Sequence, residues 1–268
     1  MVGTCGARRE EEAAAFLFRP DPIRLDSDGY TPSFTADQAA ELKAFFKRYG
    51  VVVVRDVLSS DQVAAAAAEV FEAAGLGRTP PQTLGDLERV DWESVYGSRY
   101  NRSKGFVGYD APSSECAWRS RLSPALYQAY SALFGRKDLL VKLDRFGMMR
   151  PTVFGTGGES ETPRKEWQTT GEWIHWDQNP WLEPDFVRIQ GVLALSDHTA
   201  TSGGFHCVPG FCAQWQMWAA ANEEYRSDAD LVAVPHGDSM RPHLQRLPCR
   251  PGAFSQTYGS IGTLIFTF

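Results

Sequence analysis

The pattern of apolar residues changes near Leu139, and this change limits the possible folds more than any other feature of the sequence. Before it, apolar residues recur at helical spacing, and after it short apolar segments alternate with Gly, Pro and Asp turns. The strand-like segments are 139–150, 172–177, 186–195, 204–208, 231–234 and 262–268. Short strands at such spacing are typical of an antiparallel sandwich or barrel. The sequence therefore predicts an α+β protein, with helices first and a β core after them.

Helix-start and helix-stop residues set the elements of the first half. The ranges 35–50 and 59–75 each open with a capping-box sequence and end at glycine. The range 123–135 opens with Ser-Pro, a sequence typical of a helix start, and also ends at glycine. Val51–Val54 is a fully apolar strand between the first two helices, and 76–115 is expected to be mostly loops. One more helix is expected around 211–225.

Composition excludes several classes of protein. The 268 residues carry a net charge of -6, and the basic residues are scattered, so we expect no nucleic-acid partner. No apolar run approaches the roughly 20 residues of a membrane-spanning helix. Five cysteines without a Cys-x-x-Cys pair, and an N-terminus without a secretion signal, predict free thiols and a cytoplasmic protein. We expect one domain over 1–268, with an irregular segment at 1–30, and the sequence leaves its oligomeric state open.

The segment Glu172–Trp181 holds the strongest chemical signal, the pair His175 and Asp177. Residues i and i+2 of a strand face the same side, so the imidazole and the carboxylate are expected to point into one pocket. They then supply two of the three ligands of a 2-His-1-carboxylate site, which holds Fe(II) and leaves positions open. Ile174 and Trp176 would face the opposite side, into packing. For an isolated His-x-Asp the alternative is a core histidine beside an acid.

The surrounding elements resemble a known family. After His175 and Asp177 come an apolar strand that ends in an acidic turn, 191–198, and the segment SGGFHCVPG at 202–210. Together with the helix, strand and helix that begin at 35, these motifs resemble the phytanoyl-CoA dioxygenase-like branch of the Fe(II)/2-oxoglutarate dioxygenases over roughly 35–252. The resemblance implies a double-stranded β-helix (jelly roll, cupin-like) core with N-terminal helices packed on it.

The same resemblance implies a chemistry. It makes His175 and Asp177 ligands of Fe(II), with 2-oxoglutarate and O₂ as cosubstrates and a small organic molecule as the substrate that is hydroxylated. The alternative is a non-catalytic jelly-roll protein with a binding or regulatory role. The residues of the expected pocket do not specify the substrate.

The sequence departs from the family pattern near its C-terminus. The family's second histidine ligand follows a Pro-Gly strand element by about ten residues, and an arginine that pairs with the far carboxylate of 2-oxoglutarate follows it. The matching element here is Arg250–Phe254, but no histidine occurs after His243 and the arginine is missing. We therefore expect a truncated or altered segment over 255–268, weak iron binding and little or no activity.

Four other histidines are considered as a third ligand. His206 lies in a strand and can face the interior, and His236 and His243 lie in a loop-like stretch that can supply a flexible ligand. For each, a packed or surface histidine is the alternative. His198 follows an acidic residue in a turn, so we expect it to be solvated.

Three polar residues are candidates for cosubstrate binding. Lys142 and Arg145 lie three positions apart on an expected strand, so only one of them can point inward. A buried cation there would suit a carboxylate, and a rim-exposed charge is the alternative. Gln190 can hydrogen-bond the cosubstrate or the neighbouring backbone. The tryptophans near the motif, Trp167, Trp173, Trp176 and Trp181, either wall a pocket or fill the core. Gln178 and Asn179 either line the pocket or cap the next turn.

Overall fold

A computed structural model gives the fold. It describes residues 17–73, 75–79, 84–92, 105–107, 114–141, 146–150, 165–167, 174–185, 188–199, 202, 204–229, 232–258 and 264–267. Residues 17–30 contain no helix or strand, as expected for that part of the irregular N-terminus. No helix in the described ranges has the length and apolar character needed to cross a membrane.

The helices of the first half form close to the predicted ranges, but α1 begins later than its capping-box sequence predicted, with Gln38 and not Thr35 as its N-cap. Helix α1 spans Ala39–Tyr49, and Gly50 ends it in the left-handed conformation at φ 72°, which glycine adopts without strain. Strand β2 (Val51–Val54) is buried throughout. Helix α2 (Ser60–Ala73) begins with a complete capping box, because Ser59 and Gln62 exchange side-chain to backbone hydrogen bonds of 2.9 and 3.3 Å.

The remaining helices follow the prediction less closely. Helix α6 (Pro124–Phe134) is as predicted, whereas α3 (Leu84–Glu88) and α5 (Glu115–Arg121) lie in or beside the range expected to be loops. The helix predicted around 211–225 is broken into α7 (Trp215–Ala221) and two flanking 3₁₀ turns, η3 (Phe211–Ala213) and η4 (Glu223–Tyr225). Two further 3₁₀ turns are η2 (Lys165–Trp167) and η5 (Arg241–His243).

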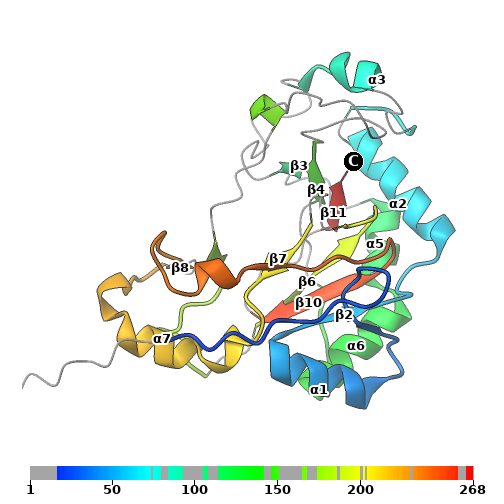
Figure 1. The fold of residues 1–268 in the computed structure, drawn as a ribbon. Helices are drawn as coiled ribbons and strands as arrows, with labels where there is room; N and C mark the ends of the chain where they lie inside the picture. Colours follow the sequence, from blue (N-terminus) through cyan, green and yellow to red (C-terminus); the bar gives the residue numbers. More distant parts are fainter. Residues whose placement is uncertain are drawn as a thin grey trace, which may run out of the picture.

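Seven of the described strands form one mixed sheet (Figure 1). In spatial order they are β1 (Ser33–Phe34), β2, β10 (Phe254–Tyr258), β6 (Ile189–Ala194), β11 (Leu264–Thr267), β4 (Phe146–Met149) and β3 (Phe106–Val107). Two short antiparallel ladders accompany this sheet, β5 (His175–Trp176) with β8 (Val232–Ala233), and β7 (His206–Cys207) with β9 (Gln245–Arg246). The α+β class is thus confirmed. Among the described strands no barrel is closed, so the jelly-roll core stays a prediction.

The antiparallel arrangement predicted for the β core does not hold throughout the described sheet. Strand β11 pairs parallel with both β6 and β4, and β1 pairs parallel with β2. Strands β10 and β11 lie on either side of β6 and run in opposite directions. Apolar alternation reports which face a side chain occupies and does not report the direction of the neighbouring strand, so the pattern could not reveal these pairings.

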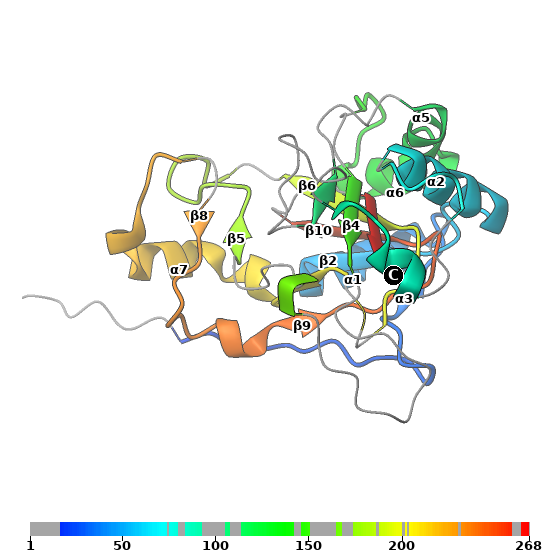
Figure 2. The same cartoon turned by 90° about the horizontal axis from the view of Figure 1, so that it is seen from above.

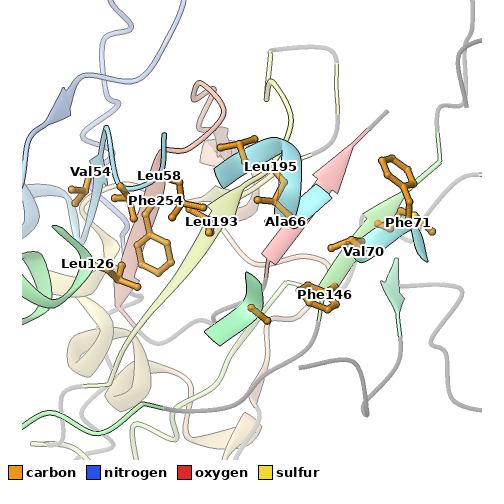
Figure 3. Packing of buried hydrophobic residues seen from close by; sticks show 14 of the residues in the cluster. Val54, Leu58, Ala66, Val70, Phe71, Leu126, Phe146, Leu193, Leu195 and Phe254 are labelled. Atoms are coloured by element: carbon orange, nitrogen blue, oxygen red, sulfur yellow. The ribbon is translucent and has the colours of Figure 1, made fainter. Parts of the chain in front are cut away.

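Helices cover one face of the seven-stranded sheet. Leu42 of α1, Phe71 of α2 and Leu126 of α6 pack with sheet residues such as Leu193 and Phe254 in one buried cluster. Figure 3 shows Phe254 and Leu193 on the sheet with Leu126 from α6 beside them. This cluster is the main core, and it holds α2 and α6 against the sheet.

The other face of the sheet is covered by the β7·β9 ladder and the N-terminal chain. Val51 of β2 packs with Leu247, Ile23 and the partly buried Cys207 of β7. Strands β5 and β8 lie farther out, beside α7 and away from α2, α5 and α6 (Figure 2). Residues of α7 and η3 form a separate core with Ile174 and Trp176 of the β5 segment. The His-x-Asp segment therefore belongs to a second layer, which contains α7 and lies away from α2, α5 and α6.

Residues 17–25, called here the N-terminal strap, run across this second layer. Gln214 accepts a hydrogen bond from the Arg19 backbone N–H at 3.1 Å and donates one to the Arg19 carbonyl at 3.0 Å. Gln245 makes the same pair with Ile23, at 2.8 and 2.6 Å. Each glutamine amide thus substitutes for one residue of a neighbouring strand and holds the strap in place.

Candidate metal centre

His175 and Asp177 converge. The Nε2 atom of His175 lies 3.6 Å from Oδ1 of Asp177, and both side chains are largely buried. His175 lies on β5 and Asp177 follows it in a bend, so the two side chains share one face as the i and i+2 spacing predicted. Ile174 and Trp176 pack on the opposite face, also as predicted.

The carboxylate of Asp177 retains an open acceptor. Asp177 is 8% exposed, and its Oδ2 atom accepts no hydrogen bond from any residue that the structure describes. A buried carboxylate oxygen normally has a partner, so this atom is a place for a cation or a hydrogen-bond donor. An imidazole nitrogen and a carboxylate oxygen are both common metal ligands. The pair therefore fits two positions of a metal site.

No third ligand joins this pair within the described ranges. There, no group of three or more His, Cys, Asp or Glu side chains is arranged to hold a metal ion. Two of the histidines considered as third ligands lie elsewhere in the second layer. His243, in η5, packs against Phe18 of the strap with ring centroids 5.3 Å apart, and His236 is exposed in a turn.

His206 and His198 each have a defined environment. On β7 the neighbouring Cys207 packs toward Val51, so alternation turns His206 to the other face of the strand. Burial lowers the pKa of His206, and nearby Arg246 lowers it further. The expectation that His198 is solvated is wrong. It is 1% exposed, and its backbone pairs with Cys249, whose Sγ lies 3.6 Å from its Nδ1.

The burial of His198 depends on a glycine. A Cβ on Gly204, which has φ +136°, would lie 3.0 Å from Nδ1 of His198. The imidazole thus lies close to Gly204, one residue of the Gly-Gly pair that the sequence analysis treated only as a turn signal. The long-range pairing with Cys249 draws the residue inward, and no local pattern predicts this pairing.

Gln190 lies on the face of the sheet toward the second layer. The alternate residues Gly191, Leu193 and Leu195 point the other way, and the latter two are part of the main core. The Oε1 atom of Gln190 is buried and accepts no hydrogen bond from the described residues. The alternative that Gln190 bonds the neighbouring backbone therefore gains no support at this atom. Lys142 and Arg145 lie outside the described residues, as does Trp173.

The residues after Asp177 cap a turn. The Asn179 side chain accepts hydrogen bonds from the backbone N–H groups of Trp181 and Leu182 and donates to the carbonyls of Ser227 and Ala229. These four bonds use the full hydrogen-bonding capacity of the side chain, so Asn179 caps this turn.

Trp181 packs with the α7 core and donates its indole N–H to the Ala219 carbonyl, and Trp167 belongs to the main core. For both tryptophans, core filling is the reading that the contacts support.

Sequence reasoning missed Arg188. Its Nη1 donates to the backbone carbonyl of Asp177 at 2.5 Å, and its backbone N–H donates to Oε1 of Gln178 at 3.2 Å. Arg188 immediately precedes β6, so these bonds join the central sheet to the bend that carries Asp177. A basic residue at the start of an apolar strand is common, and nothing in the sequence marks this one.

No protein-family model matches the chain. A curated protein of Dictyostelium discoideum named "Putative phytanoyl-CoA dioxygenase" does match. It is 23% identical over 234 residues, which cover 70% of this chain and 65% of that protein. The name of this relative agrees with the family that the sequence motifs resemble.

A solved structure has a similar fold. The GlcNAc-inducible protein GIG2 (DUF1479) from Candida albicans superposes with a TM-score of 0.50 at 14% identity. The match covers 85% of this chain and 60% of GIG2. At this identity the likeness concerns the fold alone. The chain spans less than two thirds of the length of either protein.

Proposed function

We propose that this chain is an Fe(II)- and 2-oxoglutarate-dependent dioxygenase-like protein that acts on a small organic molecule. The observation that carries the proposal is the convergence of His175 Nε2 and Asp177 Oδ1 at 3.6 Å, beside a buried carboxylate oxygen without a partner among the described residues. The similarity to a protein named as a phytanoyl-CoA dioxygenase supports the same chemistry. The arrangement in two layers, with His175 and Asp177 on the layer that contains α7, is compatible with a jelly-roll core.

In this proposal the chain's own residues bind and orient. His175 and Asp177 hold the metal, which supplies the oxidising chemistry once 2-oxoglutarate and O₂ are bound. Gln190, whose buried Oε1 faces the second layer, hydrogen-bonds the cosubstrate, and Lys142 or Arg145 pairs with a carboxylate. Trp176 packs behind the pair and keeps the two-residue strand in place.

Two protein ligands bind a metal more weakly than three, so we expect low iron affinity and impaired turnover. The absence of a third ligand group from the described residues also favours a second candidate, a non-catalytic jelly-roll protein that binds a small molecule. The two candidates differ in whether the chain takes up iron.

Anaerobic reconstitution with Fe(II), followed by elemental analysis, tests the proposal. The wild type is expected to retain iron, and His175→Ala to lose it, because one of two ligands is removed. His236→Ala is the matched control, since His236 is an exposed histidine in a turn, and it should retain iron like the wild type. Absence of iron in the wild type would support the binding protein instead. Succinate release from 2-oxoglutarate at normal turnover would contradict the expected impairment.

A further inference from the structure

Asp177 lies where its own strand no longer fixes the backbone. The β5·β8 ladder contains two residue pairs, His175 with Ala233 and Trp176 with Val232, and Asp177 follows in a bend. The direction of a side chain depends on the backbone that carries it. A carboxylate at this point therefore needs a second support to stay aligned with His175.

Arg188 supplies that support from the central sheet. Its guanidinium donates to the Asp177 carbonyl at 2.5 Å, and its backbone N–H donates to the Gln178 side chain at 3.2 Å. Gln178 is 1% exposed and donates in turn to the carbonyl of Glu183 at 3.4 Å. The bend is thus held at two consecutive residues by one residue that immediately precedes β6.

We propose that Arg188 is the positioning residue for the Asp177 carboxylate and sets the geometry and affinity of the metal site. This inference rests on the proposed function, because it requires that His175 and Asp177 bind a metal. Outer-shell groups of this kind change metal affinity by roughly 10- to 100-fold when they are removed. Arg188 does not touch the metal in this proposal, and it acts through the backbone of Asp177.

A further contact of the Arg188 guanidinium, with Glu183, provides a control. Its Nη2 atom lies 3.4 Å from Oε2 of Glu183, and the two side chains are 36% and 44% exposed. An ion pair this exposed contributes little. Glu183→Gln removes the pair and leaves the bond from Arg188 to Asp177, so it separates positioning from the ion pair.

The test is Mn(II) binding followed by electron paramagnetic resonance, with absorption spectra of the Co(II)-loaded protein. We expect Arg188→Met to weaken Mn(II) binding about tenfold and to change the Co(II) spectrum. Arg188→Lys, which keeps one donor, should weaken binding about threefold and restore most of the spectrum. Glu183→Gln should bind like the wild type. Ser123→Ala, which removes the bond from Ser123 to the Val57 carbonyl far from β5, controls for lost stability.

Each other outcome overturns the inference. Wild-type affinity in Arg188→Met, with binding lost in His175→Ala, would remove the role of Arg188 and leave the proposed function standing. Equal weakening in Ser123→Ala and Arg188→Met would show a general effect of stability. Failure of the wild type to bind Mn(II) would overturn both the inference and the proposed function. If Arg188→Met does not fold, unchanged affinity and an unchanged Co(II) spectrum in Arg188→Lys overturn the inference.

Discussion

Trp176 lies flat against Phe211, with ring centroids 5.2 Å apart and planes inclined by 5°. Trp218 meets the same indole edge-on at 4.4 Å. These contacts are on the reverse side of the strand from His175 and Asp177. A strand with two residue pairs is held by its side-chain packing more than by its hydrogen bonds, so the aromatic contacts determine where the candidate ligands lie.

Trp176→Ala should therefore destabilise the protein and weaken metal binding together. Loss of the stacked and edge-on contacts is expected to cost about 3 kcal/mol of unfolding free energy. The comparison is Trp118→Ala on α5, where the indole is 37% exposed and the expected loss is about 0.5 kcal/mol. Urea unfolding measures the free energy of unfolding of the two variants. Equal losses in the two variants would show that the aromatic contacts do not support β5.

The sequence predicted the elements whose signals are local. A helix start such as Ser59 to Gln62 and a helix stop such as Gly50 depend on residues within four positions, and both occur as expected. The shared face of His175 and Asp177 depends only on the two-residue period of a strand, and it is found as well. Local geometry of this kind can be derived from spacing alone.

Features that depend on distant residues could not be predicted. The burial of His198 comes from its pairing with Cys249, and the support of Asp177 comes from Arg188 across a turn. Strand β10 was not anticipated, because Phe254–Tyr258 alternates polar and apolar residues only weakly. Its place between β2 and β6 depends on which edges those strands leave open, and composition does not report this.

Glu69 of α2 links that helix to the start of α5, and this link predicts a pH dependence. Its Oε2 atom accepts a hydrogen bond from the Cys116 backbone N–H at 3.1 Å. Burial alone raises the pKa of Glu69, but hydrogen bonds from Ser114 and Cys116 outweigh burial and leave the pKa lowered. Because the folded state has the lower pKa, ionised Glu69 stabilises the protein above the unfolded value of roughly 4.3. That stability is lost as the pH falls through the folded pKa.

Glu69→Gln should accordingly lower the unfolding free energy by about 1 kcal/mol at pH 7. The difference from the wild type should shrink as the pH falls through the lowered pKa of Glu69 in the folded state, because Glu69 then becomes protonated in the folded protein too. Urea unfolding of both proteins between pH 3 and pH 7 measures this difference. A difference that stays constant across the range would mean that the charge of Glu69 plays no part.

Gly191 on β6 leaves room for the ring of Phe254 on β10. A Cβ at this position would lie 2.0 Å from Cε1 of Phe254. Gly191→Ala is therefore expected to cost about 3 kcal/mol through overpacking. Phe254→Leu should relieve part of that loss, so the double variant should be more stable than the sum of the single effects predicts. Gly237→Ala is the control, because nothing lies within 4 Å of a Cβ there, and its effect should stay within about 0.5 kcal/mol.

Gln245 holds the N-terminal strap through two hydrogen bonds to Ile23, and its removal should release the strap. Ile23 is 4% exposed, so Gln245→Ala leaves a buried N–H and a buried carbonyl without their partner, at a cost of about 2 kcal/mol. Hydrogen exchange of residues 17–25 should become faster, while exchange in α2 changes little. Gln216→Ala removes a single exposed bond to Pro184 and should leave exchange of the strap unchanged. Equal exchange of the strap in Gln245→Ala and the wild type would show that its other contacts, which include the two bonds between Gln214 and Arg19, suffice to hold it.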